Sequence, residues 1–377
     1  MGQHKNRIAI VSPSKHAYSE TFIKNQKDAI KGEVYYYYGG QLPRYLDEKG
    51  KVVTKFVRKK YNVLKTLNNS PFSLEEYGFI HSMRKYKIDL VFAHYGTTSH
   101  KILNVCKFLK IPLITHFHGF DASVKEHIEG SNNYKEVFEY SSYVIAVSKF
   151  MQSKLAILGC KTEKVIYNSC TPSDDFFEIK PTFKNNTFIA LGRFIDKKAP
   201  YYTILAFQKV LKEFPDAKLI VGGEGSLFEV CVNLIKHLNI GGNVKLPGKL
   251  TKEEYMEYLR TSMAFVQHSI TAINGDQEGT PVAVLEANAA GLPVISTRHT
   301  GIAEVIVHNE TGLLVEEHDV NEMALGMLSL LKDKKRAIEM GQKGKERIQK
   351  HYNSNKQIEV LDELIENAIV KYDYEEV

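Results

Sequence analysis

Two carboxylates, Glu278 and Glu286, stand on either side of the expected start of a short helix. Pro281 is preset for a first helical position and Thr280 is a good N-cap, so we expect a helix over about 281–290. The first turn of such a helix presents unpaired N–H groups and a partial positive charge. This arrangement is typical of a site for hydroxyls or an anion, but a solvated loop acid followed by an exposed helix acid would have the same spacing.

A pair of histidines lies at the end of an apolar run over 113–117. His116 and His118 are two residues apart, so they point to the same face of the expected strand. Two histidines on one face are the beginning of a metal site, but the sequence offers no third ligand at a convincing spacing. We therefore expect no metal ion here.

The elements that must position these residues alternate along the whole chain. Short apolar runs, several without polar alternation, predict parallel strands that are buried on both faces. A first set covers 8–12, 34–38, 88–95, 113–117 and 144–147, and a second covers 187–191, 218–221, 244–246, 264–267, 293–296 and 312–315. Helical patterns lie between them, as at 19–31, 98–110, 200–214 and 253–260. The alternation predicts an α/β fold with two doubly wound domains.

A turn-rich segment near 168–186 separates the two sets of strands. It predicts a first domain over residues 1–170 and a second over 171–354. The tail has a helical pattern with an interruption at about 351–355, and we expect the last segment, 355–377, to pack back on the first domain. Ligands of open α/β sheets bind beyond the carboxyl ends of the strands, where the candidate residues lie.

The composition excludes several classes of protein. Of 377 residues, 43% are hydrophobic and 25% are charged, which is unlike a collagen, a mucin or a disordered chain. No run approaches the ~20 apolar residues of a membrane span, and the first apolar run is too short for a secretory signal. Four scattered cysteines without CxxC spacing argue against a disulfide scaffold or a zinc ribbon, and predict a cytoplasmic protein.

The net charge of +6 is too mild to indicate a nucleic-acid partner, but the basic residues are unevenly spread. Residues 51–65 include six lysines and arginines and no acid. One interpretation is a solvated surface. The other is a patch for anionic lipid or a phosphate-bearing acceptor, which would place the protein peripherally on the inner face of the cell membrane.

Several motifs, in order along the chain, resemble those of one enzyme family. Glu278-Gly279-Thr280-Pro281 together with Glu286 resembles the E-x7-E signature of retaining glycosyltransferases of family 4, which have the GT-B fold. His118-Gly119-Phe120-Asp121 resembles the family's H-G-x-D. Further pieces resemble family segments at 192–200, 219–225, 244–250, 296–304 and 309–315. The resemblance implies two Rossmann-like domains, of which the first binds the acceptor and the second the nucleotide sugar.

The resemblance also implies a role for each matching residue. His118 would lie against the donor sugar, and Arg193 and Lys198 would neutralise the charge of the leaving diphosphate. Glu278 would accept hydrogen bonds from the sugar hydroxyls and Glu286 from the ribose hydroxyls. Further donor contacts are implied for Gly279, Thr280, Pro281, Val282, Gly223, Lys249 and Leu250.

The loop after the first strand departs from the common family pattern, because it lacks a glycine pair. Its Ser19-Glu20-Thr21 segment resembles a variant found in members that build exopolysaccharides, colanic-acid-type polymers and O-antigens. Ser19 would then cap the following helix. Contacts with the acceptor are implied for Ser19, Glu20, Thr21 and Asp121.

The implied reaction moves a hexosyl or N-acetylhexosaminyl group from a UDP- or GDP-sugar to a saccharide acceptor carried on a lipid, with retention and without a metal or prosthetic group. The sequence shows no obvious second carboxylate placed as a covalent nucleophile, and the resemblance therefore favours attack from the front face, with the leaving phosphate taking the proton. Three alternatives remain: a GT-B nucleotide-sugar epimerase, a non-catalytic nucleotide-binding scaffold, and a nucleic-acid-binding module, for which no motif is present.

Overall fold

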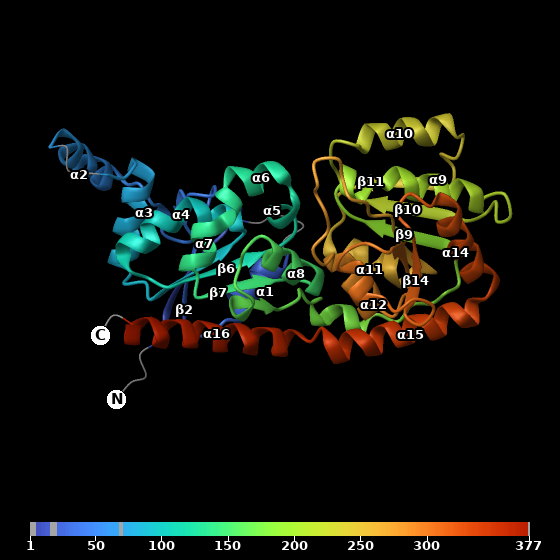
Figure 1. The fold of residues 1–377 in the computed structure, drawn as a ribbon. Coiled ribbons are helices and arrows are strands. Elements are labelled where there is room, and N and C mark those ends of the chain that lie inside the picture. Colours follow the sequence, from blue (N-terminus) through green and yellow to red (C-terminus); the bar gives the residue numbers. More distant parts are fainter. Residues whose placement is uncertain (1–4, 16–20, 68–70, 376–377) are drawn as a thin grey trace. The chain divides into compact units, whose positions relative to one another are not determined.

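The structure is a computed structural model that describes residues 5–15, 21–67 and 71–375. The chain divides into two compact units (Figure 1). Unit 1 comprises Met1–Asn168 and Gln357–Val377, and unit 2 comprises Ser169–Lys356. The boundaries thus fall at 168 and 356, against 170 and 354 in the sequence analysis.

Unit 1 is built on a sheet in the order β4-β3-β2-β1-β5-β6-β7-β8. Its strands are β1 (Arg7–Val11), β2 (Glu33–Tyr38), β3 (Tyr45–Leu46), β4 (Gly50–Lys51), β5 (Leu90–His94), β6 (Leu113–Phe117), β7 (Tyr143–Ala146) and β8 (Val165–Tyr167). All pairs are parallel except β2–β3 and β3–β4, which add an antiparallel edge. Every residue of β5 and β6 is buried, as expected of central strands covered on both faces.

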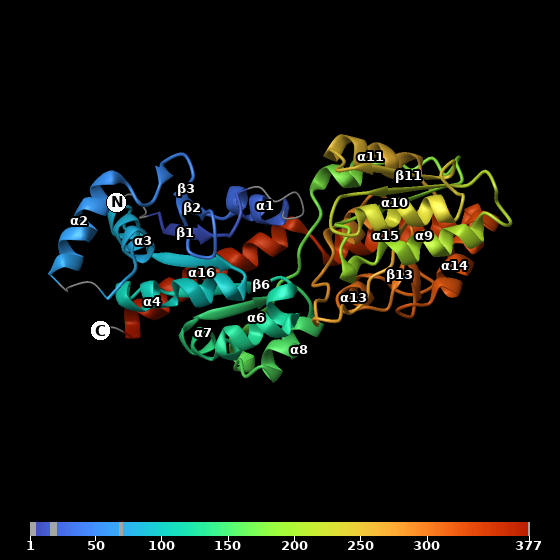
Figure 2. The ribbon, with the colours of Figure 1, turned by 90° about the horizontal axis from the view of Figure 1, so that it is seen from above.

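Helices cover the sheet of unit 1 (Figure 2). They are α1 (Thr21–Ala29), α2 (Lys55–Thr66), α3 (Leu74–Lys85), α4 (Gly96–Leu109), α5 (Phe120–Ser123), α6 (Lys125–Gly130), α7 (Lys135–Tyr140), α8 (Lys149–Ile157) and α16 (Ser354–Glu375). α16 buries Leu361, Leu364, Ile365 and Ala368 at helical spacing, and its Asp362 accepts a hydrogen bond from the Lys31 amide. The C-terminal helix therefore completes the core of unit 1.

Unit 2 contains a fully parallel sheet in the order β11-β10-β9-β12-β13-β14. Its strands are β9 (Thr187–Leu191), β10 (Lys218–Gly222), β11 (Val244–Gly248), β12 (Ala264–Gln267), β13 (Val294–Thr297) and β14 (Gly312–Val315). Its helices are α9 (Pro200–Val210), α10 (Phe228–His237), α11 (Lys252–Thr261), α12 (Val282–Ala289), α13 (Ile302–Val305), α14 (Val320–Lys332) and α15 (Lys334–His351). The strand order reverses between β9 and β12, which is where doubly wound sheets bind their ligands.

Local sequence explains where several helices begin. Ser73 and Glu76 form a capping box at the start of α3, and Thr251 and Glu254 form another at the start of α11. Ser148 accepts a hydrogen bond from the Met151 amide at the start of α8. Each cap satisfies an amide that the first turn would otherwise leave unpaired.

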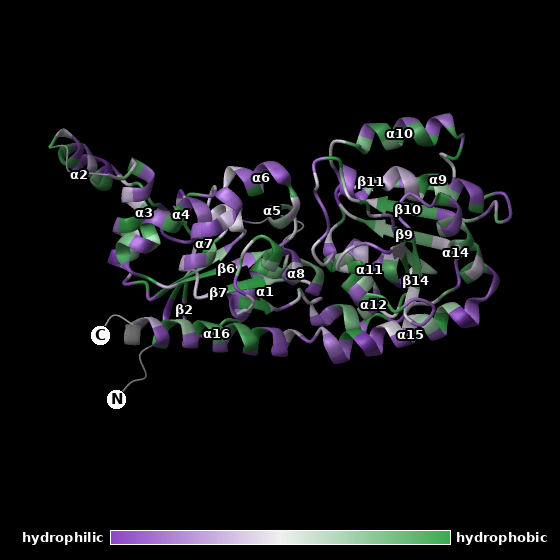
Figure 3. Ribbon diagram, viewed as in Figure 1, coloured by the Kyte–Doolittle hydropathy of each residue, from purple (hydrophilic) through white to green (hydrophobic). Residues whose placement is uncertain are grey.

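The predicted doubly wound α/β class and the predicted strand positions are confirmed. The short strands β3, β4 and β8 were not predicted, because two or three residues are too few to show a period. The helical tail is interrupted between α15 and α16, as expected. Green, hydrophobic residues line the strands of both sheets in Figure 3. In the described part of the chain no helix combines the length and the apolarity that crossing a bilayer requires.

Candidate active site

A buried ion pair marks the carboxyl edge of the sheet in unit 2. Lys198 ends a short 3-10 turn, η4 (Asp196–Lys198), after β9, and Glu278 lies in the loop between β12 and α12. Lys198 Nζ and Glu278 Oε1 are 3.0 Å apart, and their side chains are 14% and 7% exposed. One residue of the pair follows β9 and the other follows β12, and the strand order reverses between these two strands. Lys198 Nζ also lies 3.5 Å from Gln267 Oε1 at the end of β12.

Burial and charge act in opposite directions on this pair. Burial lowers the pKa of Lys198, and the carboxylate of Glu278 only partly offsets this. Burial alone would raise the pKa of Glu278, but the nearby Lys198 and Lys197 ammonium groups bring it below its usual value. The Glu278 carboxyl is therefore ionised at neutral pH. An ion pair with so little solvent around it gives a strong local field, and it is costly to break from one side.

The neighbouring Lys197 anchors the loop that carries Glu278. Its Nζ lies 2.8 Å from Asp276 Oδ1 and donates to the carbonyl of Gln277 at 3.0 Å. The Ile270 amide donates to the Lys197 carbonyl at 2.9 Å. Adjacent lysines thus have different tasks: Lys197 ties the loop to η4, and Lys198 meets the carboxylate.

Two residues of the loop after β13 hold the backbone of Glu278, and the sequence analysis did not single them out. The Glu278 amide donates to His299 Nε2 at 3.2 Å, and Thr300 Oγ1 donates to the Glu278 carbonyl at 2.9 Å. Because Nε2 accepts, the His299 proton is on Nδ1, which faces Glu317 at 2.6 Å. The only signal in the sequence was their place in the motif at 296–304.

The helix α12 begins one residue later than predicted. Pro281 has φ −67° and ψ 118°, so it is the N-cap, and the helix starts at Val282. The expectation that Thr280 is the N-cap is therefore wrong, because the extended ψ of Pro281 puts the N-cap one residue later. The Pro281 side chain makes no capping hydrogen bond. The first turn of α12, three residues after Gly279, remains the candidate for the donor contacts that the resemblance implies.

Glu286 lies on α12 and is partly buried. Burial raises its pKa to about 7, although the Lys252 ammonium acts in the opposite direction. Near neutral pH this carboxyl is therefore divided between its protonated and ionised forms. Arg193, in contrast, is exposed, and it lines the same small hollow as Lys198.

The remaining predicted donor residues lie on the loops after β10 and β11. Gly223 has φ +130°, and a Cβ there would stand 1.9 Å from the Gly192 carbonyl oxygen, so only glycine fits. The Gly223 amide donates to the Gly248 carbonyl at 2.7 Å, which joins the two loops. Lys249 is exposed and pairs with Glu224 at 3.0 Å, whereas Leu250 is buried.

In unit 1, Asp121 organises the loop after β6. It is fully buried, and burial raises its pKa even though backbone amides donate to the carboxylate. Oδ1 accepts from the amides of His118 and Gly119 at 3.0 Å each, and Oδ2 accepts from the Gly96 amide at 2.9 Å. The carboxylate therefore ties the H-G-x-D loop to the start of α4. Thr21 is the first residue of α1, and Ser19 and Glu20 lie outside the described residues.

His118 and His116 have a companion that the sequence analysis missed. His94, the last residue of β5, pairs in register with His116 of β6. His94 Nδ1 lies 3.1 Å from His118 Nε2, and one ring nitrogen from each of the three residues can be chosen so that all lie within 4.8 Å of one another. Nothing in the spacing linked His94 to the pair, because the connection between β5 and β6 runs through α4.

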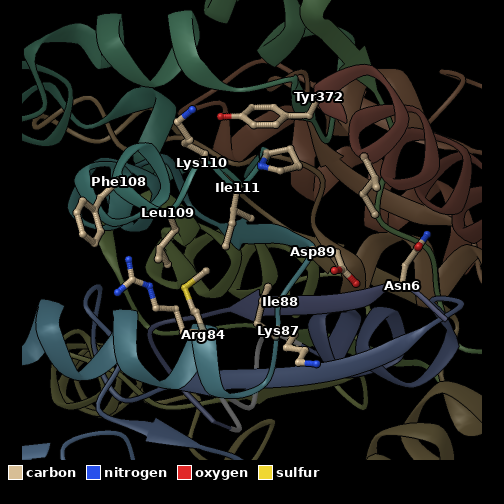
Figure 4. A pocket seen from close by; sticks show the side chains of 13 residues that line it. Asn6, Arg84, Lys87, Ile88, Asp89, Phe108, Leu109, Lys110, Ile111 and Tyr372 are labelled. Atoms are coloured by element: carbon tan, nitrogen blue, oxygen red, sulfur yellow. The ribbon is translucent and has the colours of Figure 1, made fainter. Parts of the chain in front are cut away.

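A hollow of unit 1 lies away from these candidates. Its volume is about 590 Å³, and it sits at the amino ends of β1, β5 and β6 (Figure 4). Arg84, Lys110 and Asp89 line it together with Tyr372 of α16. Because ligands of doubly wound sheets bind at the opposite edge, we do not assign the chemistry to this hollow.

Comparison with protein families accounts for both units. Residues 31–171 match the model described as Glycosyltransferase Family 4, and residues 173–347 match the model described as Glycosyl transferases group 1. The chain belongs to the family 4 glycosyltransferases. The family predicted from the motifs is thereby confirmed.

Two curated relatives of this glycosyltransferase take part in polysaccharide synthesis according to their names. The amylovoran biosynthesis glycosyltransferase AmsK of Erwinia amylovora is 28% identical over 291 residues, which are 75% of this chain and 71% of AmsK. WcaL of Escherichia coli strain K12, provisionally named a colanic acid biosynthesis glycosyltransferase, is 27% identical over 246 residues. That alignment spans 63% of this chain and 60% of WcaL, less than two thirds of its length.

A solved structure shows the fold of this glycosyltransferase. HepE of Anabaena, in complex with UDP and glucose, superimposes with a TM-score of 0.75. The match covers 96% of this chain and 100% of that chain at 15% sequence identity. The predicted GT-B fold is confirmed.

Proposed function

We propose that this glycosyltransferase moves a hexosyl or N-acetylhexosaminyl group, with retention, from a UDP- or GDP-sugar to a lipid-linked saccharide during the synthesis of a surface polysaccharide. The observation that carries the proposal is the buried Lys198–Glu278 pair, which lies just before the start of α12, where the N-cap residue is Pro281. The names of AmsK and WcaL support the polysaccharide, and the UDP bound to HepE supports a uridine nucleotide.

In this proposal, binding of the donor separates Lys198 from Glu278. The diphosphate of the donor accepts hydrogen bonds from Lys198 and Arg193, and the carboxylate of Glu278 then accepts hydrogen bonds from the sugar hydroxyls. As the bond from the anomeric carbon to phosphate breaks, the two cations and the first amides of α12 stabilise the growing charge. The acceptor oxygen bonds to the same face, and its proton passes to the leaving phosphate oxygen.

The test is a donor screen followed by product analysis. We expect one class of nucleotide sugar to raise the unfolding temperature of the full chain by mass action, and Glu278→Ala to remove transfer of the sugar to a lipid-linked saccharide. Glu339→Ala, an exposed acid on α15, is the matched control. The anomeric configuration of the product, read by NMR, tests retention.

Three outcomes would contradict the proposal. An inverted product would exclude retention, and free epimerised nucleotide sugar would identify an epimerase. Donor binding without transfer to any saccharide would indicate a nucleotide-binding scaffold.

Donor affinity is expected to depend on pH through Glu286. Its pKa is raised to about 7, and two ribose hydroxyls need the ionised form as their acceptor. Donor binding should therefore release a proton from Glu286. The affinity for the donor should rise from pH 6 to pH 8, and below the pKa of Glu286 it should rise by at most about tenfold per pH unit. Calorimetry with the nucleotide sugar found in the screen measures this, because its diphosphate diester does not titrate in this range. The Glu286→Gln variant should bind the donor more weakly, and its affinity should not change with pH. The control Glu339→Gln should keep the pH dependence of the wild type. A wild-type affinity that does not change with pH would contradict this role of Glu286.

We also propose that α2 holds the protein on an anionic membrane surface. Thr54 caps this helix, and Val57 and Tyr61 face the core. Phe56 and Val63 on this helix and Leu67 at its C-cap are exposed to 61%, 57% and 62%. Their spacing places them on one face of the helix. Five exposed cations flank them, namely Lys55, Arg58, Lys59, Lys60 and Lys65.

The combination of apolar and basic side chains is typical of a helix that lies in the membrane interface. Figure 3 shows both hydropathy colours on α2. A solvated helix has no need for three large apolar side chains on its exposed face. An acceptor carried on a lipid would also reach the enzyme only at such a surface.

Vesicle binding tests the role of α2. We expect the full chain to sediment with vesicles that contain phosphatidylglycerol and not with phosphatidylcholine vesicles. Changing Lys59 and Lys60 to glutamine should weaken binding about fivefold per charge, since each cation contributes about 1 kcal/mol near an anionic surface. Phe56→Ser should weaken binding too, whereas Ile157→Ser, a change at an even more exposed apolar residue on α8, should not. Equal binding to both kinds of vesicle, or no binding, would contradict the proposal.

A further inference from the structure

Three histidines of unit 1, His94, His116 and His118, form a cluster that the proposed transfer reaction does not explain. His94 and His116 are fully buried, and His118 is partly exposed. The ring centroids of His116 and His118 are 4.1 Å apart, and those of His94 and His116 are 5.5 Å apart. The transfer reaction uses at most His118, so the other two rings have no assigned task.

Most of the ring nitrogens in this cluster have no hydrogen-bond partner among the described residues. The exception is the contact between His94 Nδ1 and His118 Nε2. His94 Nε2, both nitrogens of His116 and His118 Nδ1 are buried and unpaired. A buried polar group without a partner costs about 1–3 kcal/mol. Several such groups in one place therefore indicate a ligand that satisfies them together.

The surroundings favour a cation that binds neutral imidazole. Phe22 and Tyr95 pack against His118, and Phe92 stacks on His116, so the pocket wall is aromatic. The nearby carboxylate of Asp121 is taken up by backbone amides. Burial disfavours the charged form of an imidazole, so each of these rings is neutral and offers a lone pair.

We propose that His94, His116 and His118 bind one divalent transition-metal ion, with Zn²⁺ the best fit. Imidazole suits Zn²⁺, and three histidines leave one of four tetrahedral positions open. The partly exposed His118 provides the way in. Nitrogen ligands of one tetrahedral Zn²⁺ lie about 3.3 Å from one another. The ring nitrogens, which are now up to 4.8 Å apart, must therefore move closer when the ion binds. The hydrogen bond between His94 and His118 must break at the same time.

Metal binding can be measured without the transferase reaction, so failure here leaves the proposed function untouched. The full chain is stripped with a chelator, and Zn²⁺ and Co²⁺ are titrated separately. We expect one ion per chain, a rise in the unfolding temperature, and visible Co²⁺ absorption of the tetrahedral type. His116→Phe keeps an aromatic ring beside Phe92 and removes both nitrogens, so it should fold and bind at least tenfold more weakly.

Two further variants complete the test. His94→Phe should also lose affinity at least tenfold, because it removes a second ligand. His237→Ala, an exposed histidine of unit 2, should bind as the wild type does. If the wild type binds neither ion more tightly than His116→Phe does, or if His237→Ala loses the binding, the proposed site is wrong.

Discussion

Replacing Lys198 by alanine is expected to lower kcat at least tenfold and to destabilise unit 2. The loss in kcat follows from removing a cation that stabilises the leaving diphosphate, and tenfold corresponds to about 1.4 kcal/mol. The loss in stability has a separate cause. Glu278 would remain buried and charged without its partner, which typically costs about 3–5 kcal/mol. Steady-state kinetics and thermal unfolding of the same preparations measure the two effects.

A second substitution separates the two effects of Lys198→Ala. Adding Glu278→Gln removes the buried unpaired charge, so the double variant should regain part of the lost stability and none of the lost activity. Arg193→Ala should lower kcat alone, because the Arg193 side chain is exposed and leaves no buried charge behind. Lys335→Ala, an exposed lysine on α15, is the control. Near-native kcat in both Lys198→Ala and Arg193→Ala would exclude the diphosphate role.

Replacing Asp121 by alanine is expected to destabilise unit 1 by about 3 kcal/mol or more. The change leaves the amides of Gly96, His118 and Gly119 without their acceptor, and each unpaired buried amide costs about 1–3 kcal/mol. Burial of this carboxyl is itself unfavourable, so its removal offsets part of the loss, and we expect a value near the lower end of the sum. Asp121→Asn keeps one acceptor oxygen, so its effect should be smaller.

If Asp121 acts as described, Asp121→Ala should lower the stability of unit 1 and not that of unit 2. Calorimetry should show that the transition of unit 1 moves down in Asp121→Ala, while protection of unit 2 by a nucleotide sugar persists. Asp28→Ala, an exposed acid on α1, should leave both transitions in place. An unchanged transition of unit 1 in Asp121→Ala would show that the amides find other partners.

The division into two α/β units could be predicted from the sequence because it rests on local signals. Runs such as 113–117 and 187–191 are apolar throughout, and a strand buried on both faces needs nothing else. Ser73 and Thr251, which the sequence analysis did not single out, are also local signals, since a cap acts on amides only two or three residues away. The E-x7-E motif likewise lies within one loop and one helix.

The contacts within each candidate site were decided by the tertiary structure. Lys198 meets Glu278, and His94 meets His116, because parallel strands bring the ends of distant segments to one edge of a sheet. The connections between such strands vary in length, so no spacing in the sequence marks the partners. The start of α12 was missed for a related reason: Pro281 fixes its own φ, but its ψ depends on how the loop packs. The sequence by itself thus determined the strands and helices and named the candidate segments for the chemistry, and the pairing of strands decided which side chains meet.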